Sequence, residues 1–477
     1  MCSSDLFAVN VSDITGVSYD TVDYETYKKS TVTGKDIHNQ FQSAQLSYYG
    51  EEDMPSVSRS DWTGTWPAKK YEHDLTDKML NELTGYKTYD YKDYQVTGET
   101  MPVFGSTETN YKLYDLTGKD YDDPLWEKLL NQITFKEACH LVGVGYHGTS
   151  IVESVSKPAT TDENGPQGFS ANLTNLSGDV VSLCAYTDEN IMAATWNVEL
   201  MKEVGEHIGE DGLKSGYSGL YGPAMNTHRT AYAGRNFEYY SEDGFLAGKI
   251  AAAEVEGIQS KGVYVFVKHF ALNDCETACR SISTFVNEQA IRELYLQPFE
   301  YAITEGGAYN VMNSFARVGV IWSGAHYGLM TEVLRNEWGC RGFGISDYTS
   351  NGYATTAHPR GTYDAYLAVV AGTDTFDSSN SVAQESYLLD TDPNDIHMYN
   401  CLRQACHRIL YVVGNSNAMN STGITVSQMT WWQFVIIDGI IWSCVGTCVF
   451  GTLLTIRLIK NKKNYGEAKL GGTNDEK

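Results

Sequence analysis

Carboxylates and basic side chains stand directly after several apolar segments of this chain. Among them, Asp347 is the strongest candidate for a catalytic residue. It follows the apolar segment Phe343–Ser346 and precedes Tyr348. A carboxylate held beside an aromatic ring suits attack on the anomeric carbon of a glycoside. An Asp at this point of a chain is equally suited to capping the next helix. Asp347 by itself leaves both interpretations open.

Comparable polar groups follow the other segments that we predict to be strands. They are Asn226-Thr227-His228-Arg229, Lys268-His269, Asn313-Ser314, Ser346-Asp347 and Asp374 to Ser378. In a barrel of parallel strands the carboxyl ends meet at one face, and the chemistry is placed there. These side chains are therefore expected to lie close together.

The elements that would position them alternate regularly between about Pro124 and Gly414. Helical faces, each closed by glycine, precede strands predicted at 218–226, 263–267, 309–313 and 343–346. This alternation predicts a parallel α/β architecture, and we expect a (β/α)8 TIM-like barrel. The competing fold is a doubly wound open sheet. It would more often carry a Gly-rich phosphate loop after its first strand, and none stands out.

Several separate motifs strengthen this interpretation because they occur in a fixed order. They are Gly234-Arg235-Asn236-Phe237-Glu238, Lys268-His269-Phe270, Val286-Asn287-Glu288, Val311-Met312-Asn313-Ser314 and Gly342-Phe343-Gly344-Ile345-Ser346-Asp347-Tyr348. Together they resemble the N-terminal barrel domain of glycoside hydrolase family 3, from about Ser154 to Asp377. The resemblance covers roughly half of the chain.

The resemblance implies a role for each matching residue. Asp347 corresponds to the nucleophile of a retaining double displacement. Arg235, Lys268 and His269 correspond to residues that hold sugar hydroxyls in the first subsite, and charged donors suit that task.

Three positions depart from the family pattern. Asn164 stands where the family usually has Asp, so the shape is kept and the charge is lost. Asp162, two residues earlier, would replace the charge lost at Asn164 only if its loop took a different shape. Arg280 corresponds to a further sugar-contacting arginine, but the segment 275–280 is one residue longer than usual. Phe315 replaces a tyrosine found in many members.

Within the family that the chain resembles, the β-N-acetylglucosaminidase branch carries an Asp/His pair in the loop after the Lys-His-Phe strand. The corresponding loop here, 271–280, contains no His, so the resemblance points to the β-glucosidase-like branch. In that branch the general acid/base usually comes from a second domain. Residues 1–125 are too short for such a domain but resemble the tail of one. We therefore expect an N-terminally truncated form of a longer exported enzyme, and the acid/base is left unassigned.

The C-terminal segment Trp431–Ile456 is largely apolar, with a single charge at Asp438. As a helix it would be roughly 39 Å long, enough to span a bilayer. Tryptophans stand at its start, and Arg457 and Lys460 are among the basic residues beyond its end. The positive-inside rule then predicts a single-pass protein of the cell membrane with the barrel outside. The start, Met1–Val9, lacks the pattern of a signal peptide, so the export route is open.

The net charge of -25 excludes nucleic acid as a favourable partner. Cys275 and Cys279 lie four apart with no second pair at zinc spacing, so we expect no metal and no cofactor. The expected partners are a β-linked oligosaccharide or glycoside and the membrane.

These observations predict five regions. They are a β-rich, loop-rich region at 1–125, the hydrolase barrel at 126–414, a polar linker at 415–430, a transmembrane helix at 431–456 and a cytoplasmic tail at 457–477. The predicted function is a retaining β-glycosidase at the cell surface. The alternatives are a catalytically impaired carbohydrate-binding surface protein without its acid/base, and a different carboxylate-dependent barrel hydrolase.

Overall fold

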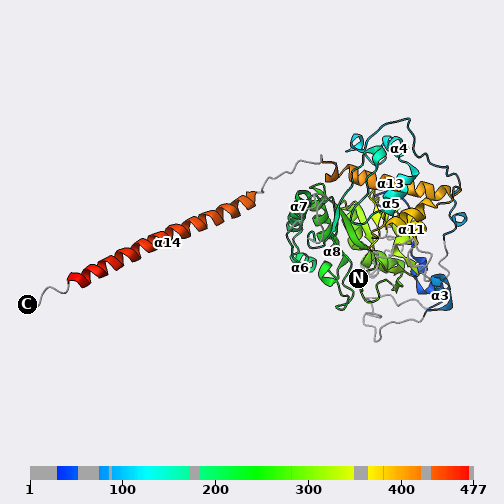
Figure 1. Ribbon diagram of the computed structural model, residues 1–477. Coiled ribbons are helices and arrows are strands. Elements are labelled where there is room, and N and C mark those ends of the chain that lie inside the picture. The colour runs from blue at the N-terminus through cyan, green and yellow to red at the C-terminus, as the bar shows by residue number, and fades with distance from the viewer. Residues whose placement is uncertain are drawn as a thin grey trace, which may run out of the picture. The chain divides into compact units, whose positions relative to one another are not determined.

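The computed structural model describes residues 29–51, 75–84, 89–170, 183–280, 282–348, 364–379, 381–420 and 431–471. The chain divides into two compact units, Met1–Ser421 and Thr422–Lys477. In the first unit, strands lie between α7 and α8 on one side and α5, α11 and α13 on the other (Figure 1). Each unit is described by itself.

The central sheet of the first unit is parallel, in the order β1-β2-β3-β5-β8. Its strands are β1 (Asp162–Asn164), β2 (Gly219–Tyr221), β3 (Tyr264–Phe270), β5 (Asn310–Asn313) and β8 (Gly344–Ile345). A parallel bridge from Ile345 to Thr375 continues it by one more segment. The predicted parallel α/β architecture is confirmed as a half-barrel sheet. Closure into an eight-stranded barrel stays a prediction.

A second, small sheet consists of β4 (Ser283–Thr284), β6 (Arg317–Val318) and β7 (Ile321–Trp322). Strands β2, β3, β5 and β8 occur where the sequence predicts them, and all but β3 are shorter than predicted; β1 was not predicted. The predicted strand 218–226 is reduced to β2, which ends before Pro223. Proline has no N–H to donate to a neighbouring strand, which accounts for this early end.

Helices connect and cover the strands. They are α4 (Leu125–Leu130), α5 (Phe135–Gly143), α6 (Glu189–Ala194), α7 (Val198–Ser215), α8 (Gly244–Gln259), α9 (Glu288–Ala290), α10 (Gln297–Thr304), α11 (Ala365–Ala371), α12 (Ser381–Leu389) and α13 (Ile396–Gly414). Two predicted helical faces, around residues 295 and 331, include π-helical turns at Ile291–Tyr295 and Gly328–Glu337.

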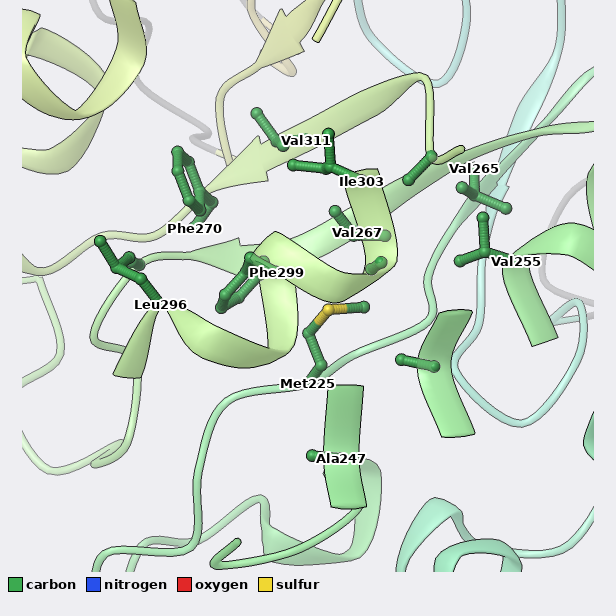
Figure 2. Close-up of a cluster of buried hydrophobic side chains, with 14 of the residues drawn as sticks. Met225, Ala247, Val255, Val265, Val267, Phe270, Leu296, Phe299, Ile303 and Val311 are labelled. Atoms are coloured by element: carbon green, nitrogen blue, oxygen red, sulfur yellow. The ribbon is translucent and has the colours of Figure 1, made fainter. Parts of the chain in front are cut away.

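The sheet separates two hydrophobic cores because alternate residues of a strand face opposite sides. Val265 and Val267 of β3 belong to the core that packs against α8 and α10, here called the α8 core. Figure 2 draws part of it, with Val265, Val267, Val311, Phe299 and Ile303 labelled. Tyr264 and Phe266 belong to the other core, which packs against α5, α11 and α13 and is here called the α13 core. All seven residues of β3 are buried, as expected for a parallel strand covered on both faces.

The helices α7 and α8 pack unusually closely because glycines face each other. A Cβ added to Gly205 would lie 2.3 Å from the carbonyl oxygen of Glu254, and one added to Gly257 would lie 2.2 Å from that of Lys202. Helix α7 begins at Asn197, whose side chain accepts from the Leu200 N–H.

The expectation of β-structure in residues 1–125 is not met in the part of that region that the structure describes. There the chain forms α3 (Asp77–Thr84), short 3₁₀ turns at Gln42–Ala44, Leu46–Tyr49, Tyr91–Asp93 and Leu113–Leu116, and one bridge between Lys29 and Asp36. Phe41 lies in the α8 core and Leu113 in the α13 core. Apolar side chains buried in the main cores help to hold these segments, together with hydrogen bonds from the N–H groups of Gln40 and Phe41 to the Glu288 carboxylate. The domain limits predicted from sequence stay predictions.

A buried ion cluster ties the C-terminal strands together. Asp374 is fully buried, and its carboxylate accepts from Arg335 Nη2 at 2.9 Å and from Arg408 Nε and Nη2 at 2.9 and 2.6 Å. The N–H of Gly344, at the start of β8, donates to the same carboxylate at 2.8 Å. The cluster thus joins β8, the segment after α11, the π-helical segment and α13.

The second unit contains α14 (Trp431–Gly471). Its segment Asp438–Lys463 has a mean hydropathy of 1.8 and is long and apolar enough to cross a membrane. The described side chains of this segment are exposed within the unit.

The ion cluster predicts a large effect for a small substitution. Asp374→Asn leaves two buried guanidinium groups without a counter-charge, and we expect the free energy of unfolding to fall by about 3–5 kcal/mol. Lys249→Gln is the matched control, because the Lys249–Glu305 pair is partly exposed and should contribute less than about 1 kcal/mol. Urea denaturation followed by tryptophan fluorescence measures both. Equal shifts in the two variants would contradict the role given to the cluster.

Candidate active site

A cavity of about 370 Å³ opens at the carboxyl ends of the parallel strands. It is lined by Tyr146, His147, Asn164, Arg235, Lys268, His269, Met312, Asp347, Tyr348 and Asp377. Five residues that the sequence singled out, far apart along the chain, therefore meet in one place. They are Asn164, Arg235, Lys268, His269 and Asp347.

Asp347 lies just beyond β8, with its side chain 15% exposed. Its Oδ1 accepts from the Tyr348 N–H at 2.7 Å, and its Oδ2 lies 3.9 Å from Nε2 of His269. Burial raises the pKa of Asp347 to about 6, although the Tyr348 N–H and the charges of Arg235 and Lys268 act in the opposite direction. The carboxylate is therefore mostly ionised at neutral pH while largely removed from water.

His269 is fixed through both its backbone and its ring. The side chain of Asn226 accepts from the His269 N–H at 2.8 Å and donates to its carbonyl at 3.0 Å. Burial, followed by the charges of Arg235 and Lys268, holds the pKa of His269 well below its usual range, so the ring is neutral. Arg235 Nη1 lies 3.2 Å from Nε2, which makes Nε2 the acceptor. The Nδ1–H then faces the Tyr239 hydroxyl at 3.3 Å.

Arg235 is oriented by a neighbouring carboxylate. Its Nε and Nη2 donate to the two oxygens of Glu238 at 2.9 and 2.5 Å. This two-point contact fixes the guanidinium plane and leaves Nη1 directed toward His269. Glu276 lies 3.7 Å from Nη1 on the outer side.

Lys268 stands two residues after Phe266 on β3, and its side chain is only 4% exposed. Burial lowers its pKa, which the carboxylates of Glu238 and Asp347 partly counteract. A buried ammonium group beside an ionised nucleophile forms a strong point of attraction for a polar ligand.

Asn164 is the last residue of β1 and lines the cavity. Asp162 does not take its place: it is fully buried and accepts from the Tyr264 hydroxyl at 2.6 Å. Two residues along a strand return to the same face, but Asp162 lies deeper in the sheet than the cavity does.

Arg280 is not brought into the cavity lining. Its guanidinium lies 4.8 Å from the centre of the Phe315 ring, and the residue is exposed. The structure therefore separates Arg280 from the other residues that the sequence grouped with it.

Sequence reasoning did not assign a role to Tyr146, His147, Met312 or Asp377, which also line the cavity. Asp377 belongs to the polar segment Asp374–Ser378, so its position after a predicted strand was the available signal. Tyr146 and Tyr348 bring their rings to 5.8 Å across the mouth, and no spacing in the sequence indicates this approach. Among the described residues, no group of three or more His, Cys, Asp or Glu side chains is arranged to hold a metal ion.

Comparison with known proteins shows the family to which this part of the chain is similar. Residues 182–409 match the sequence model of the Glycosyl hydrolase family 3 N terminal domain, which confirms the resemblance inferred from the motifs. Beta-glucosidase B of Emericella nidulans is 34% identical over 223 residues, covering 46% of this chain and 26% of the relative. The thermostable beta-glucosidase B of Acetivibrio thermocellus is 33% identical over 228 residues, covering 46% and 30%. The chain thus spans less than a third of the length of these curated relatives.

Solved structures show the same fold. Beta-glucosidase 3B of Thermotoga neapolitana, in complex with glycerol, is 30% identical with a TM-score of 0.54, covering 64% of this chain and 44% of the other. A beta-glucosidase from Paenibacillus barengoltzii is 26% identical with a TM-score of 0.59, covering 74% and 38%. These relatives are named as glycosidases, which favours a hydrolase over the non-enzymatic alternative.

The raised pKa of Asp347 makes a prediction about stability. The folded state holds this proton more tightly than the unfolded chain, so between about pH 4 and 6 the unfolded chain binds fewer protons and stability falls as pH rises. A pKa of about 6 instead of 3.8 corresponds to about 3 kcal/mol at pH 7. Asp347→Asn should therefore be more stable than the wild type at pH 7 by roughly this amount, with little difference near pH 4.

Denaturant titrations at both pH values test this. Asp122→Asn serves as the control, because the Asp122 side chain is 76% exposed and its removal should change little at either pH. An Asp347→Asn variant that is equally or less stable at pH 7 would show that burial does not penalise the charged carboxylate.

Proposed function

Over residues 182–409 the chain belongs to glycosyl hydrolase family 3, and from that premise we propose that it is a retaining β-glycosidase of the β-glucosidase type. The observation that carries the proposal is the placement of the Asp347 carboxylate in a cavity with Arg235, Lys268 and His269. A nucleophile and hydroxyl-binding donors are the parts that such a reaction requires at the sugar.

In the proposed reaction, Asp347 Oδ attacks the anomeric carbon and forms a covalent glycosyl-aspartate. The bond to the leaving oxygen breaks with its electron pair, and that oxygen takes up a proton. Water then attacks the same carbon from the opposite face, releases the sugar and regenerates the carboxylate, so two inversions retain the configuration. The residue that gives and takes the proton is left unassigned.

The surrounding residues are proposed to hold the sugar. Lys268 supplies a buried ammonium donor, and Arg235 supplies an N–H held in position by Glu238. His269 is proposed as a further contact to a hydroxyl, which would take the place of Arg235 Nη1 at Nε2. The Asn164 amide offers one donor group and one acceptor oxygen. Arg280 is the weakest member of this set because it lies over Phe315, outside the cavity lining.

Two architectural statements belong to the same proposal. The half-barrel sheet is proposed to be part of a closed (β/α)8 barrel within residues 126–414, preceded by the region 1–125. The segment Trp431–Ile456 of α14 is proposed to anchor the chain in the cell membrane after the linker 415–430, with the tail 457–477 cytoplasmic. The length and hydropathy of the helix support the anchor.

The nucleophile assignment predicts a rescue by a small anion. Asp347→Ala should lower kcat/KM on an activated aryl β-glucoside by at least about 10³-fold, because the covalent route is closed. Azide fits the space left by the carboxylate and can form a C–N bond to the anomeric carbon as the aryl oxide leaves. Added azide should restore turnover and give the α-glycosyl azide, identified by NMR of the product. Asp122→Ala should behave as the wild type with or without azide. A fully active Asp347→Ala variant, or a β-configured azide product, would refute the assignment.

The membrane proposal is tested by truncation. A chain ending before Trp431 should appear in the soluble fraction, whereas the full chain should sediment with membranes and resist extraction by high salt and alkali. A chain lacking only residues 464–477 is the control and should stay with the membranes. Identical fractionation of all three chains would remove the anchor from the account.

A further inference from the structure

Asp377 lies beside Asp347 on the neighbouring segment of the sheet. Ile345 and Thr375 form a parallel bridge, and each aspartate stands two residues further along its own segment. Hydrogen bonds continue the alignment beyond the bridge: Ser346 N–H donates to the Thr375 carbonyl at 3.2 Å, and Asp377 N–H donates to Ser346 Oγ at 2.9 Å. Neighbouring strands lie about 4.8 Å apart, so two carboxyl groups start from adjacent points of the cavity wall.

The carboxyl group of Asp377 is buried in this wall, and one of its two oxygens has no hydrogen-bond partner among the described residues. The side chain is 2% exposed, and the backbone N–H of His147 donates to the carboxyl group. The other oxygen, Oδ1, is buried and has no hydrogen-bond partner among the described residues. A buried polar atom without a partner is uncommon in folded proteins, and a ligand in the cavity would supply one.

The two aspartates differ in charge state. Burial raises the pKa of Asp377 well above its usual range, and the nearby charge of Asp347 raises it further. Burial raises the pKa of Asp347 only to about 6. Of the two carboxyl groups, Asp377 therefore holds its proton to higher pH, and in its neutral form it offers an O–H donor to the cavity.

We propose that Asp377 is a specificity-determining residue, whose protonated carboxyl group donates a hydrogen bond to the sugar hydroxyl next to the reacting carbon. This inference rests on the proposed function, because it takes the anomeric carbon to lie at Asp347. The anomeric carbon is bonded to one other ring carbon, so the substituent on that carbon is the sugar hydroxyl nearest to a group that starts one strand spacing from the nucleophile. That substituent is the 2-hydroxyl, whose hydrogen bonds strengthen as the transition state forms.

The chemistry of the rest of the wall is consistent with this role. Asn164 stands where the family resemblance expects a carboxylate, so the cavity has lost one ionised acceptor there. Asp377 adds a carboxyl group at a different point of the wall, beside the nucleophile.

Binding measurements test the inference without requiring turnover. The wild-type chain should bind glucose roughly tenfold more tightly than 2-deoxyglucose in calorimetry, the effect of one hydrogen bond. In Asp377→Ala this preference should fall to about one, through loss of glucose affinity alone. Asp377→Asn should keep most of the preference, because its amide N–H can donate from the same position.

Glu254→Gln is the matched control. Glu254 is also fully buried with one oxygen unpartnered among the described residues, but it lies on α8 outside the cavity lining. Its substitution should leave the preference unchanged. An Asp377→Ala variant that keeps the tenfold preference, a wild-type chain without any preference, or a wild-type chain that binds neither sugar would each overturn the inference. Loss of the azide rescue at Asp347 with the sugar preference intact would instead count against the proposed function alone.

Discussion

The site depends on the buried contact between one carboxylate, Asp374, and the guanidinium groups of Arg335 and Arg408. Strand β8 has only two residues, too few for its own backbone hydrogen bonds to fix its position firmly. Asp374 supplies what the strand lacks, because it accepts from the Gly344 N–H as well as from both arginines. Asp347 lies three residues beyond Gly344, so the cluster anchors the strand from which the nucleophile candidate extends.

The same cluster connects the two aspartates of the cavity. Asp374 and Asp377 belong to one segment, and Ser346, the residue before Asp347, bonds to that segment through both its N–H and its Oγ. The ion pairs of Asp374 therefore help to fix the backbone segments that carry the Asp347 and Asp377 carboxyl groups. Buried carboxyl groups without a paired cation lower the free energy of unfolding, and the ion pairs of Asp374 help to offset that loss.

Within the cavity, burial shifts the pKa values of neighbouring side chains, so groups of different charge lie close together. His269 is neutral, Asp347 is ionised at neutral pH, and Lys268 has a lowered pKa although carboxylates lie near it. Supporting contacts from Asn226, Glu238 and Tyr239 fix the orientations of Arg235 and His269. The arrangement is polar and is held in position by contacts among the protein's own side chains, which is what stabilisation of developing charge requires.

The sequence predicted the parts of this structure that follow a period or a motif. The central strands β3 and β5, the helices α7 and α8 and five cavity residues were found because apolar periodicity and motif order are local properties. The β-structure expected in residues 1–125 is absent from the described part of that region apart from one bridge, because its tyrosines and turns give no period and side chains such as Phe41 pack into the main core. Asp377 was grouped with the strand-end residues but given no role, and Tyr146 was missed, because their places beside Asp347 and Tyr348 depend on strand register and loop approach.

The most direct test of the account is to trap the covalent intermediate. The chain is incubated with an activated 2-deoxy-2-fluoro-β-glucoside, which slows both displacement steps but has a leaving group good enough to permit the first. Intact mass and peptide mapping then show whether a sugar is attached and where. The account predicts one fluoroglucosyl group per chain, in ester linkage to Asp347. A chain that stays unlabelled, or a label on any other carboxylate, would contradict it.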